Sequence, residues 1–343
     1  MPAAIEFTAP RVINVIDIPD APAPPPGQAT IRTHRMGVCG TDISCFLGKF
    51  PFFDYPRTPG HELGVEVVAI GDGVTHVQPG DRCSLEPYLN DPASHISQKG
   101  ATNCCPALQV LGVHCDGGLR KGTYNVPAHK LHPGNDLSYD QLALVETLGI
   151  GSHAVQRANP QSGETVVVIG AGPIGLACLE FLKLMEGVTV IVIDLVQSRL
   201  DFCRDTLRIP HTVLASADPL DAIEAITGGR LADVVIDATG SPKSMSGCLE
   251  FAGFTGRVVY VGVTTSEISF PHAPILHRRE LTLMASRNAL PQDFTKIIGL
   301  MRSGHIHTAP WITHRLNIDE VPGGFEKLTD PELGAIKAII EVD

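Results

Sequence analysis

A short glycine-rich tract, GAGPIG at 170–175, has the clearest chemical pattern in this chain. Gly170, Gly172 and Gly175 follow the apolar run TVVVI and open a run with helical character. In a strand–turn–helix context, the first glycine allows a tight turn and the second lets the backbone approach a pyrophosphate. The third lets helix and strand pack closely. Because the helix N-terminus offers free N–H groups to phosphate, the tract predicts a dinucleotide site.

Asp194 ends the next apolar run, VTVIVID, at the distance where such domains recognise the ribose 2′-hydroxyl. A carboxylate there accepts that hydroxyl and repels a 2′-phosphate, so the sequence predicts NAD rather than NADP. Arg199 follows a few residues later and argues in the other direction, because an arginine can bind a 2′-phosphate. An alternative is a doubly wound domain that binds FAD, an S-adenosyl ligand or no ligand.

Four dispersed residues have side chains that zinc accepts as ligands: Cys39, His61, Glu62 and Glu146. Each also has a simpler explanation. Cys39 could be a small buried hydrophobic residue, His61 a loop residue, and the two glutamates solvated. Their long separations give no local metal signature, so spacing alone does not establish a site.

Four tracts occur in the order found in the medium-chain zinc alcohol and polyol dehydrogenases: GVCGTD at 37–42, PGHELGVEV at 59–67, VETLGIGSHAV at 145–155, and GAGPIG. The chain resembles that family over most of its length, including the tail from residue 313, and is most similar to its sorbitol, threonine and galactonate dehydrogenase branch. The resemblance implies an α/β protein with a GroES-like, mostly β catalytic domain and a Rossmann doubly wound nucleotide-binding domain. It also implies a homodimer or homotetramer.

By this resemblance Cys39 and His61 are zinc ligands, and Glu62 and Glu146 complete the ligand set or exchange within it. Adjacent residues on a strand face opposite ways, so His61 and Glu62 can reach one metal only across a bend. Glu146 therefore ranks above Glu62 as a direct ligand, although the family usually has proline where Thr147 follows it.

The tract that contains Cys39 also supplies three candidate catalytic residues. By resemblance, the Thr41 hydroxyl binds the substrate oxygen and begins proton removal, and Asp42 orients the ligand histidine. A helix-capping or turn role is the alternative for Asp42. Ser44 stands where the family often has a proton-carrying histidine. A hydroxyl relays a proton through water but does not hold it, so we expect a water chain or a different base.

Substrate contacts are suggested by Arg287, Asn288 and Glu86. Arg287 matches the region where polyol dehydrogenases place a substrate-binding arginine, and a guanidinium suits a polyhydroxy chain or a carboxylate. An interface or structural role is the alternative for Arg287, and a structural role for Glu86. The resemblance adds three cofactor contacts, Pro173, Ile174 and Val261.

The segment 91–105 departs from the family. There, four cysteines with the spacing C-x2-C-x2-C-x7-C normally hold a structural zinc, whereas this chain has Asp91, Ser94, Ser97 and Cys105. A structural zinc needs four soft or borderline ligands in a closed tetrahedron. We therefore expect one catalytic zinc and no structural zinc.

Length and composition indicate the domain organisation, the excluded partners and the location of the protein. A chain of 343 residues suggests two domains, and turn-rich β-type segments give way near residue 150 to alternating strands and helices. We expect a catalytic, zinc-binding domain at 1–150 and 286–343 and an NAD-binding domain at 151–285. A net charge of −11 without basic runs argues against nucleic acid and membrane partners. Nine scattered cysteines and no recognisable secretory signal or membrane span predict a cytoplasmic protein.

These observations predict a zinc- and NAD-dependent dehydrogenase that oxidises a secondary alcohol of a polyol, sugar acid or hydroxy amino acid to a ketone. One alternative is a zinc-free, NADP-dependent quinone or enone reductase of the same superfamily, which lacks the Cys39 and His61–Glu62 positions. The other is a non-catalytic nucleotide-binding paralogue, which has no physical need to keep Cys39, Thr41, His61 and Glu146 together.

Overall fold

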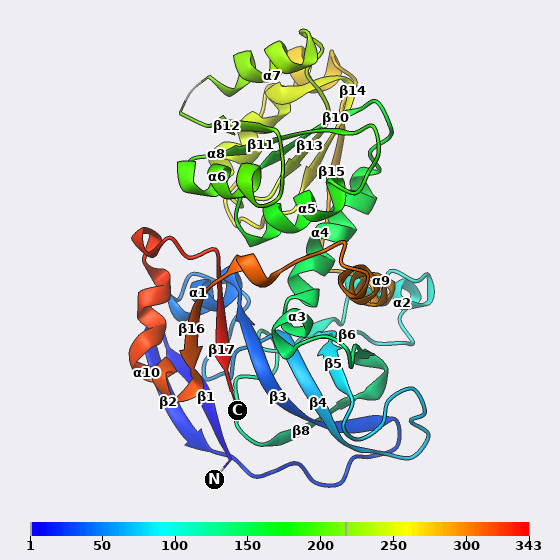
Figure 1. The fold of residues 1–343 in the computed structure, drawn as a ribbon, viewed down its shortest axis with the longest axis vertical. Coiled ribbons are helices and arrows are strands. Elements are labelled where there is room, and N and C mark those ends of the chain that lie inside the picture. Colours follow the sequence, from blue (N-terminus) through cyan, green and yellow to red (C-terminus); the bar gives the residue numbers. More distant parts are fainter. Residues whose placement is uncertain (1, 217, 343) are drawn as a thin grey trace. The chain divides into compact units, whose positions relative to one another are not determined.

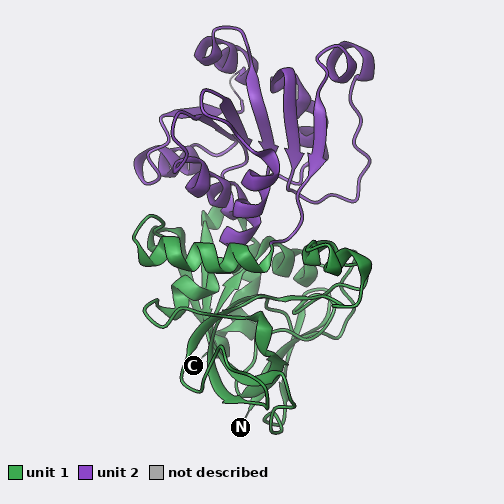
Figure 2. Cartoon of the chain, turned by 90° about the vertical axis from the view of Figure 1, so that its right-hand side faces the viewer, with its two compact units in different colours: residues 1–146, 290–343 green, residues 147–289 purple. Residues whose placement is uncertain are grey.

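The computed structural model describes residues 2–216 and 218–342. The chain forms two compact units (Figure 2): unit 1 comprises Met1–Glu146 and Leu290–Asp343, and unit 2 comprises Thr147–Ala289. The boundaries expected from the sequence, after residues 150 and 285, each differ by four residues from those of the structure. No helix among the described residues is long and apolar enough to cross a bilayer.

Unit 1 is built on a seven-stranded sheet in the order β16-β17-β3-β4-β5-β9, with β8 also paired to β3. Its strands are β3 (Gln28–Val38), β4 (Glu62–Ile70), β5 (Arg82–Leu85), β8 (Thr123–Pro127), β9 (Leu131–Pro133), β16 (Ile312–Asn317) and β17 (Lys337–Glu341). Two small sheets pair β1 (Ala3–Ala9) with β2 (Val12–Asp17) and β6 (Tyr88–Leu89) with β7 (Gln109–Val110). The C-terminal strand β17 therefore lies beside β3, although the two are far apart in the sequence (Figure 1).

Alternating side chains of these strands fill one apolar core. Leu63, Val65 and Val67 of β4 are fully buried, and the ring of Phe7 contacts that of Phe325 at 5.3 Å. Short helices join the strands: α1 (Gly40–Phe46), α2 (His95–Gln98), α3 (Tyr139–Ala143), α9 (Pro291–Arg302) and α10 (Val321–Gly324). The helix α4 (Val145–Ala158) begins in unit 1 at the unit boundary.

Unit 2 contains a six-stranded, fully parallel sheet. Its strands are β10 (Thr165–Ile169), β11 (Thr189–Asp194), β12 (His211–Leu214), β13 (Ala232–Asp237), β14 (Ala252–Tyr260) and β15 (Thr282–Ala285). Their order is β12-β11-β10-β13-β14-β15, which is 3-2-1-4-5-6 in chain order. The intervening helices include α5 (Pro173–Leu182), α6 (Gln197–Asp205), α7 (Pro219–Thr227) and α8 (Pro242–Gly247). This is the doubly wound nucleotide-binding arrangement, so the predicted fold class is confirmed.

The burial of β10 explains why its sequence lacks alternation. All five residues of TVVVI are buried, as expected for a central parallel strand with both faces covered. The chain order reverses between β10 and β13, and ligands of such sheets bind at this switch point, beyond the carboxyl ends of the strands.

Candidate active site

Three of the predicted metal ligands come together in unit 1. One ligand atom each from Cys39, His61 and Glu62 lies within 4.8 Å of the others, and no other such group occurs in residues 2–216 and 218–342. Cys39 follows β3 directly, and Glu62 is the first residue of the neighbouring strand β4. His61 lies just outside β4, and the preceding Gly60 has φ of 108°, which supplies the bend that the sequence required. A thiol, an imidazole and a carboxylate at this spacing suit zinc.

Asp42 links α1 to this group. Its Oδ2 accepts a hydrogen bond from the backbone nitrogen of Cys39 at 2.8 Å, which caps α1. Its Oδ1 lies 3.7 Å from Nδ1 of His61, an ion-pair separation longer than a hydrogen bond. Burial raises the pKa of Asp42 and by itself lowers that of His61. Asp42, the hydrogen bond and charge of Cys39, and Glu146 together outweigh burial at His61 and hold its pKa well above the ordinary value.

Glu62 is paired with a lysine that the sequence analysis did not select. Nζ of Lys337, on β17, donates to Oε1 of Glu62 at 2.6 Å, and both side chains are buried. Burial lowers the pKa of Lys337, but Glu62, Cys39 and Glu146 together outweigh burial and the net shift is upward. A Cβ atom on Gly37 would lie 2.0 Å from Oε2 of Glu62, so this carboxylate requires a glycine there. The one sequence signal for Lys337 is a lone charge within the apolar strand AIKAII.

Glu146 lies close to this group but is not one of the three. It occupies the first turn of α4, and its Oε1 accepts a hydrogen bond from the Tyr88 hydroxyl. Burial raises the pKa of Glu146 to about 7, while the nearby His61 acts in the opposite direction. Tyr88 is a second functional candidate that sequence reasoning missed, since its partner is 58 residues away.

Thr41 and Ser44 lie on α1, half-buried and three residues apart. Residues at this spacing are neighbours on one helix surface, so both hydroxyls lie along the same side of α1.

Glu86 is fully buried in unit 1, and each of its carboxylate oxygens has a side-chain partner. Nζ of Lys130 lies 2.5 Å from Oε1, and Nε2 of His132 lies 3.2 Å from Oε2. Lys130 also donates to Oδ1 of Asn90 at 3.0 Å. This pattern supports the structural alternative for Glu86.

The segment 91–105, which lacks three of the four family cysteines, is held together by hydrogen bonds. The Cys105 sulfur lies 3.4 Å from both the Ser94 hydroxyl and the backbone nitrogen of Asp91. The Ser94 hydroxyl donates to that of Ser97, which also accepts a hydrogen bond from the Asn90 amide, each at 3.0 Å. The hydrogen bond from Ser94 is the main cause that lowers the pKa of Cys105, to about 7. The four positions that carry zinc ligands in the family therefore remain neighbours here.

In unit 2, the glycine tract forms the predicted strand–turn–helix. Gly170 follows β10 with φ of 97°, and a Cβ on Gly175 would lie 1.7 Å from the carbonyl oxygen of Gly170. Gly172 is the N-cap of α5 and provides no side-chain cap, and Pro173 and Ile174 open the helix. The first N–H groups of α5 thus have no side-chain cap, as a phosphate site requires.

Asp194 ends β11, and its carboxylate accepts hydrogen bonds from the backbone of this turn and of the residues that follow β11. Its Oδ2 accepts a hydrogen bond from the backbone nitrogen of Ala171 at 2.6 Å, and its Oδ1 one from Val196 at 2.8 Å. A carboxylate can accept about four hydrogen bonds, so capacity remains for a ribose hydroxyl. A terminal nitrogen of Arg199 lies 3.8 Å from the position that a Cβ on Gly172 would take, so its positive charge is close to the turn.

The remaining predicted contacts follow the carboxyl ends of other strands in the same parallel sheet. Val261 comes directly after β14 and is buried. Its backbone nitrogen donates a hydrogen bond to the backbone carbonyl oxygen of Asp237 at 2.9 Å. Arg287 and Asn288 follow β15 and belong to unit 2. Because carboxyl ends of parallel strands share one edge of a sheet, these residues lie at the edge that carries the glycine turn.

Two family models match the chain. One, described as the alcohol dehydrogenase GroES-like domain, matches residues 25–136, and the other, described as zinc-binding dehydrogenase, matches residues 173–303. The chain is 36% identical to an L-galactonate-5-dehydrogenase of Escherichia coli K12 over 322 residues, 94% of each protein.

Solved structures give the same fold. A dehydrogenase of Escherichia coli CFT073 complexed with NADH is 26% identical, has a TM-score of 0.90, and the match covers 99% of each chain. A putative zinc-binding dehydrogenase of Sinorhizobium meliloti bound to NADP is 26% identical with a TM-score of 0.89, and the match covers 100% of this chain and 99% of the other.

Proposed function

Because the chain belongs to the zinc-type medium-chain alcohol and polyol dehydrogenases, we propose that it oxidises a secondary alcohol of a polyol, sugar acid or hydroxy amino acid with zinc and NAD. Family membership makes it an oxidoreductase that acts on CH–OH groups. The grouping of Cys39, His61 and Glu62 is the observation that carries the zinc proposal.

Cys39 and His61 would hold the zinc, with Glu62 and Glu146 as the carboxylates that complete the set or exchange within it. The donor chemistry of these side chains supports this assignment. When bound, zinc acts as a Lewis acid that lowers the pKa of an alcohol. Asp42, 3.7 Å from Nδ1 of His61, would orient the imidazole.

The residues of α1 would move the proton. The Thr41 hydroxyl would hydrogen-bond the substrate hydroxyl and pass its proton on, and Ser44 would relay the proton toward water. In the complete reaction, the alcohol carbon loses a hydride to the nicotinamide ring, the alcohol oxygen loses a proton, and NAD is reduced as the ketone forms.

The choice of NAD rests on Asp194. Its carboxylate lies at the glycine turn and would repel a 2′-phosphate. Two backbone N–H groups fix the carboxylate in this position, so we expect its repulsion to outweigh the attraction of Arg199 for a 2′-phosphate. The two solved neighbours hold NADH and NADP respectively, so the relatives favour neither cofactor.

A sugar acid is the favoured substrate class. The relative named for L-galactonate supports it, and Arg287 would bind a remote carboxylate or hydroxyl. Polyols and hydroxy amino acids share the secondary alcohol and remain within the proposal.

A cofactor and substrate panel tests the proposal. Zinc-loaded protein should reduce NAD with at least one aldonate, polyol or hydroxy amino acid, and should use NADP less well. NADPH-dependent reduction of quinones or enones, with no alcohol oxidation, would support the zinc-free reductase instead. Tight NAD binding without turnover on any class would support the non-catalytic paralogue.

A further inference from the structure

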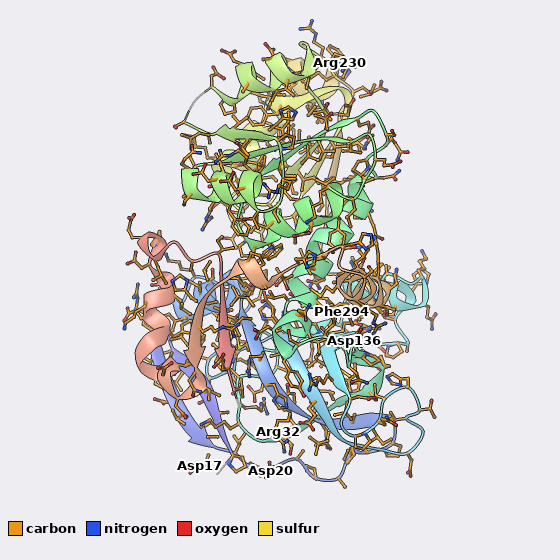
Figure 3. All side chains as sticks on the ribbon, viewed as in Figure 1. Asp17, Asp20, Arg32, Asp136, Arg230 and Phe294 are labelled. Carbon is orange, nitrogen blue, oxygen red and sulfur yellow. The ribbon has the colours of Figure 1, made fainter. Side chains whose placement is uncertain are left out.

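Tyr88 contacts a candidate metal ligand but has no role in the proposed reaction. It lies on the two-residue strand β6, is 2% exposed, and donates its hydroxyl proton to Oε1 of Glu146, which is also buried. The ring packs edge-on against Phe294 of α9, with centroids 6.3 Å apart and an angle of 76°. Phe294 is labelled in Figure 3. Tyr88 is thus a buried, neutral hydrogen-bond donor aimed at one oxygen of a candidate metal ligand.

The side chains two residues before and two residues after Tyr88 bind the same lysine. Nζ of Lys130 binds Glu86 at 2.5 Å and Asn90 at 3.0 Å, so the residues two before and two after Tyr88 share one partner. His132, which binds the other oxygen of Glu86, stacks on Phe294 with centroids 4.8 Å apart. This network leaves Tyr88 little freedom to follow Glu146 if that carboxylate moves.

The two candidate carboxylates therefore have different partners. Glu62 belongs to the group formed with Cys39 and His61, whereas Glu146 is not a member. A carboxylate oxygen that has lost its hydrogen bond lacks a partner, and near a bound cation it gains most by becoming a ligand. A catalytic zinc keeps three protein ligands and one position for substrate, so a fourth protein ligand would compete with the alcohol.

We infer that Tyr88 is a positioning residue that holds Glu146 back from the metal, and thereby keeps a coordination position open for the substrate oxygen. The inference rests on the proposed function, because it requires a metal at Cys39, His61 and Glu62. It assigns the four candidate ligands unequal roles: three bind the metal in the resting protein, and Glu146 is restrained.

Cobalt substitution tests this directly, since the visible bands of bound Co²⁺ depend on the identity and number of its ligands. In the full-length protein, Tyr88→Phe should change the position and intensity of these bands and slow removal of the metal by a chelator. It should also raise KM for the alcohol several-fold while NAD affinity stays unchanged. Tyr124→Phe is the matched control, because its buried hydroxyl contacts Thr33 at 2.9 Å and should change neither the spectrum nor metal release.

Glu146→Gln provides a second, independent variant if Tyr88→Phe folds poorly. If Glu146 is held off the metal, its conversion to an amide should leave the cobalt spectrum of the otherwise wild-type protein unchanged. In the Tyr88→Phe background it should restore the wild-type spectrum. A spectrum that changes in Glu146→Gln alone, or does not change in Tyr88→Phe, overturns the inference. A wild-type protein that takes up no cobalt would instead overturn the proposed metal site, and the role of Tyr88 with it.

Discussion

The ammonium group of Lys337 contacts Glu62 at 2.6 Å, and each of the two side chains is only 1% exposed. A buried ion pair gives little net stability, because the loss of hydration offsets the attraction. Removing one partner nevertheless leaves an unpaired buried charge, which is costly. Glu62 thus depends on a positive partner at all times, and that partner can be Lys337, a metal ion or both.

Lys337→Met should therefore lower the free energy of unfolding by about 3–5 kcal/mol in metal-free protein. Added zinc should recover part of this loss, because the metal gives Glu62 a second positive partner. Urea unfolding with and without zinc measures both effects.

Two controls make that experiment specific. Lys121→Met removes an exposed partner of Asp319 and should cost about 0–1 kcal/mol, with no zinc dependence. The double variant Lys337→Met/Glu62→Gln should be less destabilised than the single one. Equal losses in the single and double variants would show that Lys337 acts through packing rather than charge.

The contrast between Gly175 and Lys337 shows what sequence can predict here. The spacing of Gly170, Gly172 and Gly175 lies within one turn, so the local chain sets the geometry and the pattern is readable. Lys337 and Glu62 are 275 residues apart and meet only because β17 pairs with β3. No spacing rule covers that distance, and only the sheet order reveals the contact.

The placement of Glu146 above Glu62 as a direct zinc ligand depends on the alternation of side chains along a strand. Alternation predicts that His61 and Glu62 point in opposite directions. However, His61 precedes β4 and follows Gly60, which has a positive φ. The rule therefore does not apply at that residue pair. The restraint on Glu146 by Tyr88 depends on packing around β6, which the sequence LEPY does not disclose.

Cys39→Ala should abolish turnover while NAD binding stays nearly unchanged, because the glycine turn belongs to unit 2 and Cys39 to unit 1. Steady-state assays measure turnover, and titration with NADH, followed by its fluorescence, measures cofactor binding separately. Cys115→Ala is the control, since Cys115 is also a free, half-buried cysteine but is not part of the metal group. Parallel loss of activity and NAD affinity would contradict the assignment of the two sites.

The purified protein should contain about one zinc per chain. Cys105 is the one thiol among the four positions of the segment 91–105 that hold a structural zinc in the family. Its neighbours Ser94 and Ser97 are joined to each other by a hydrogen bond. One thiol, two hydroxyls and the Asp91 carboxylate would hold zinc poorly. Elemental analysis after dialysis checks the number, and Cys105→Ser should leave it unchanged. Two zincs per chain would contradict the expectation.

Arg287→Ala should lower kcat/KM for sugar acids and polyols much more than for simple alcohols. If Arg287 binds a remote carboxylate or hydroxyl, its loss damages substrate alignment and not zinc chemistry. Arg204→Ala serves as control, because this exposed arginine of the same unit pairs with Asp201 and should be neutral. Equal losses on both substrate classes would indicate a cofactor or structural role for Arg287.

Replacement of Asp194 should narrow the preference for NAD over NADP. The carboxylate offers the ribose a charge-assisted hydrogen bond worth about 1.5–3 kcal/mol, roughly a 10- to 150-fold change in the ratio of kcat/KM values. Asp194→Ala also removes the acceptor for the Ala171 N–H at 2.6 Å, so it should weaken binding of both cofactors. Asp194→Asn separates the two effects, because its amide oxygen can still accept from Ala171 while the charge that repels a 2′-phosphate is gone. We therefore expect Asp194→Asn to gain activity with NADP and Asp194→Ala to lose affinity for both. A wild-type protein that already uses NADP better than NAD would show that Arg199, and not Asp194, determines the cofactor.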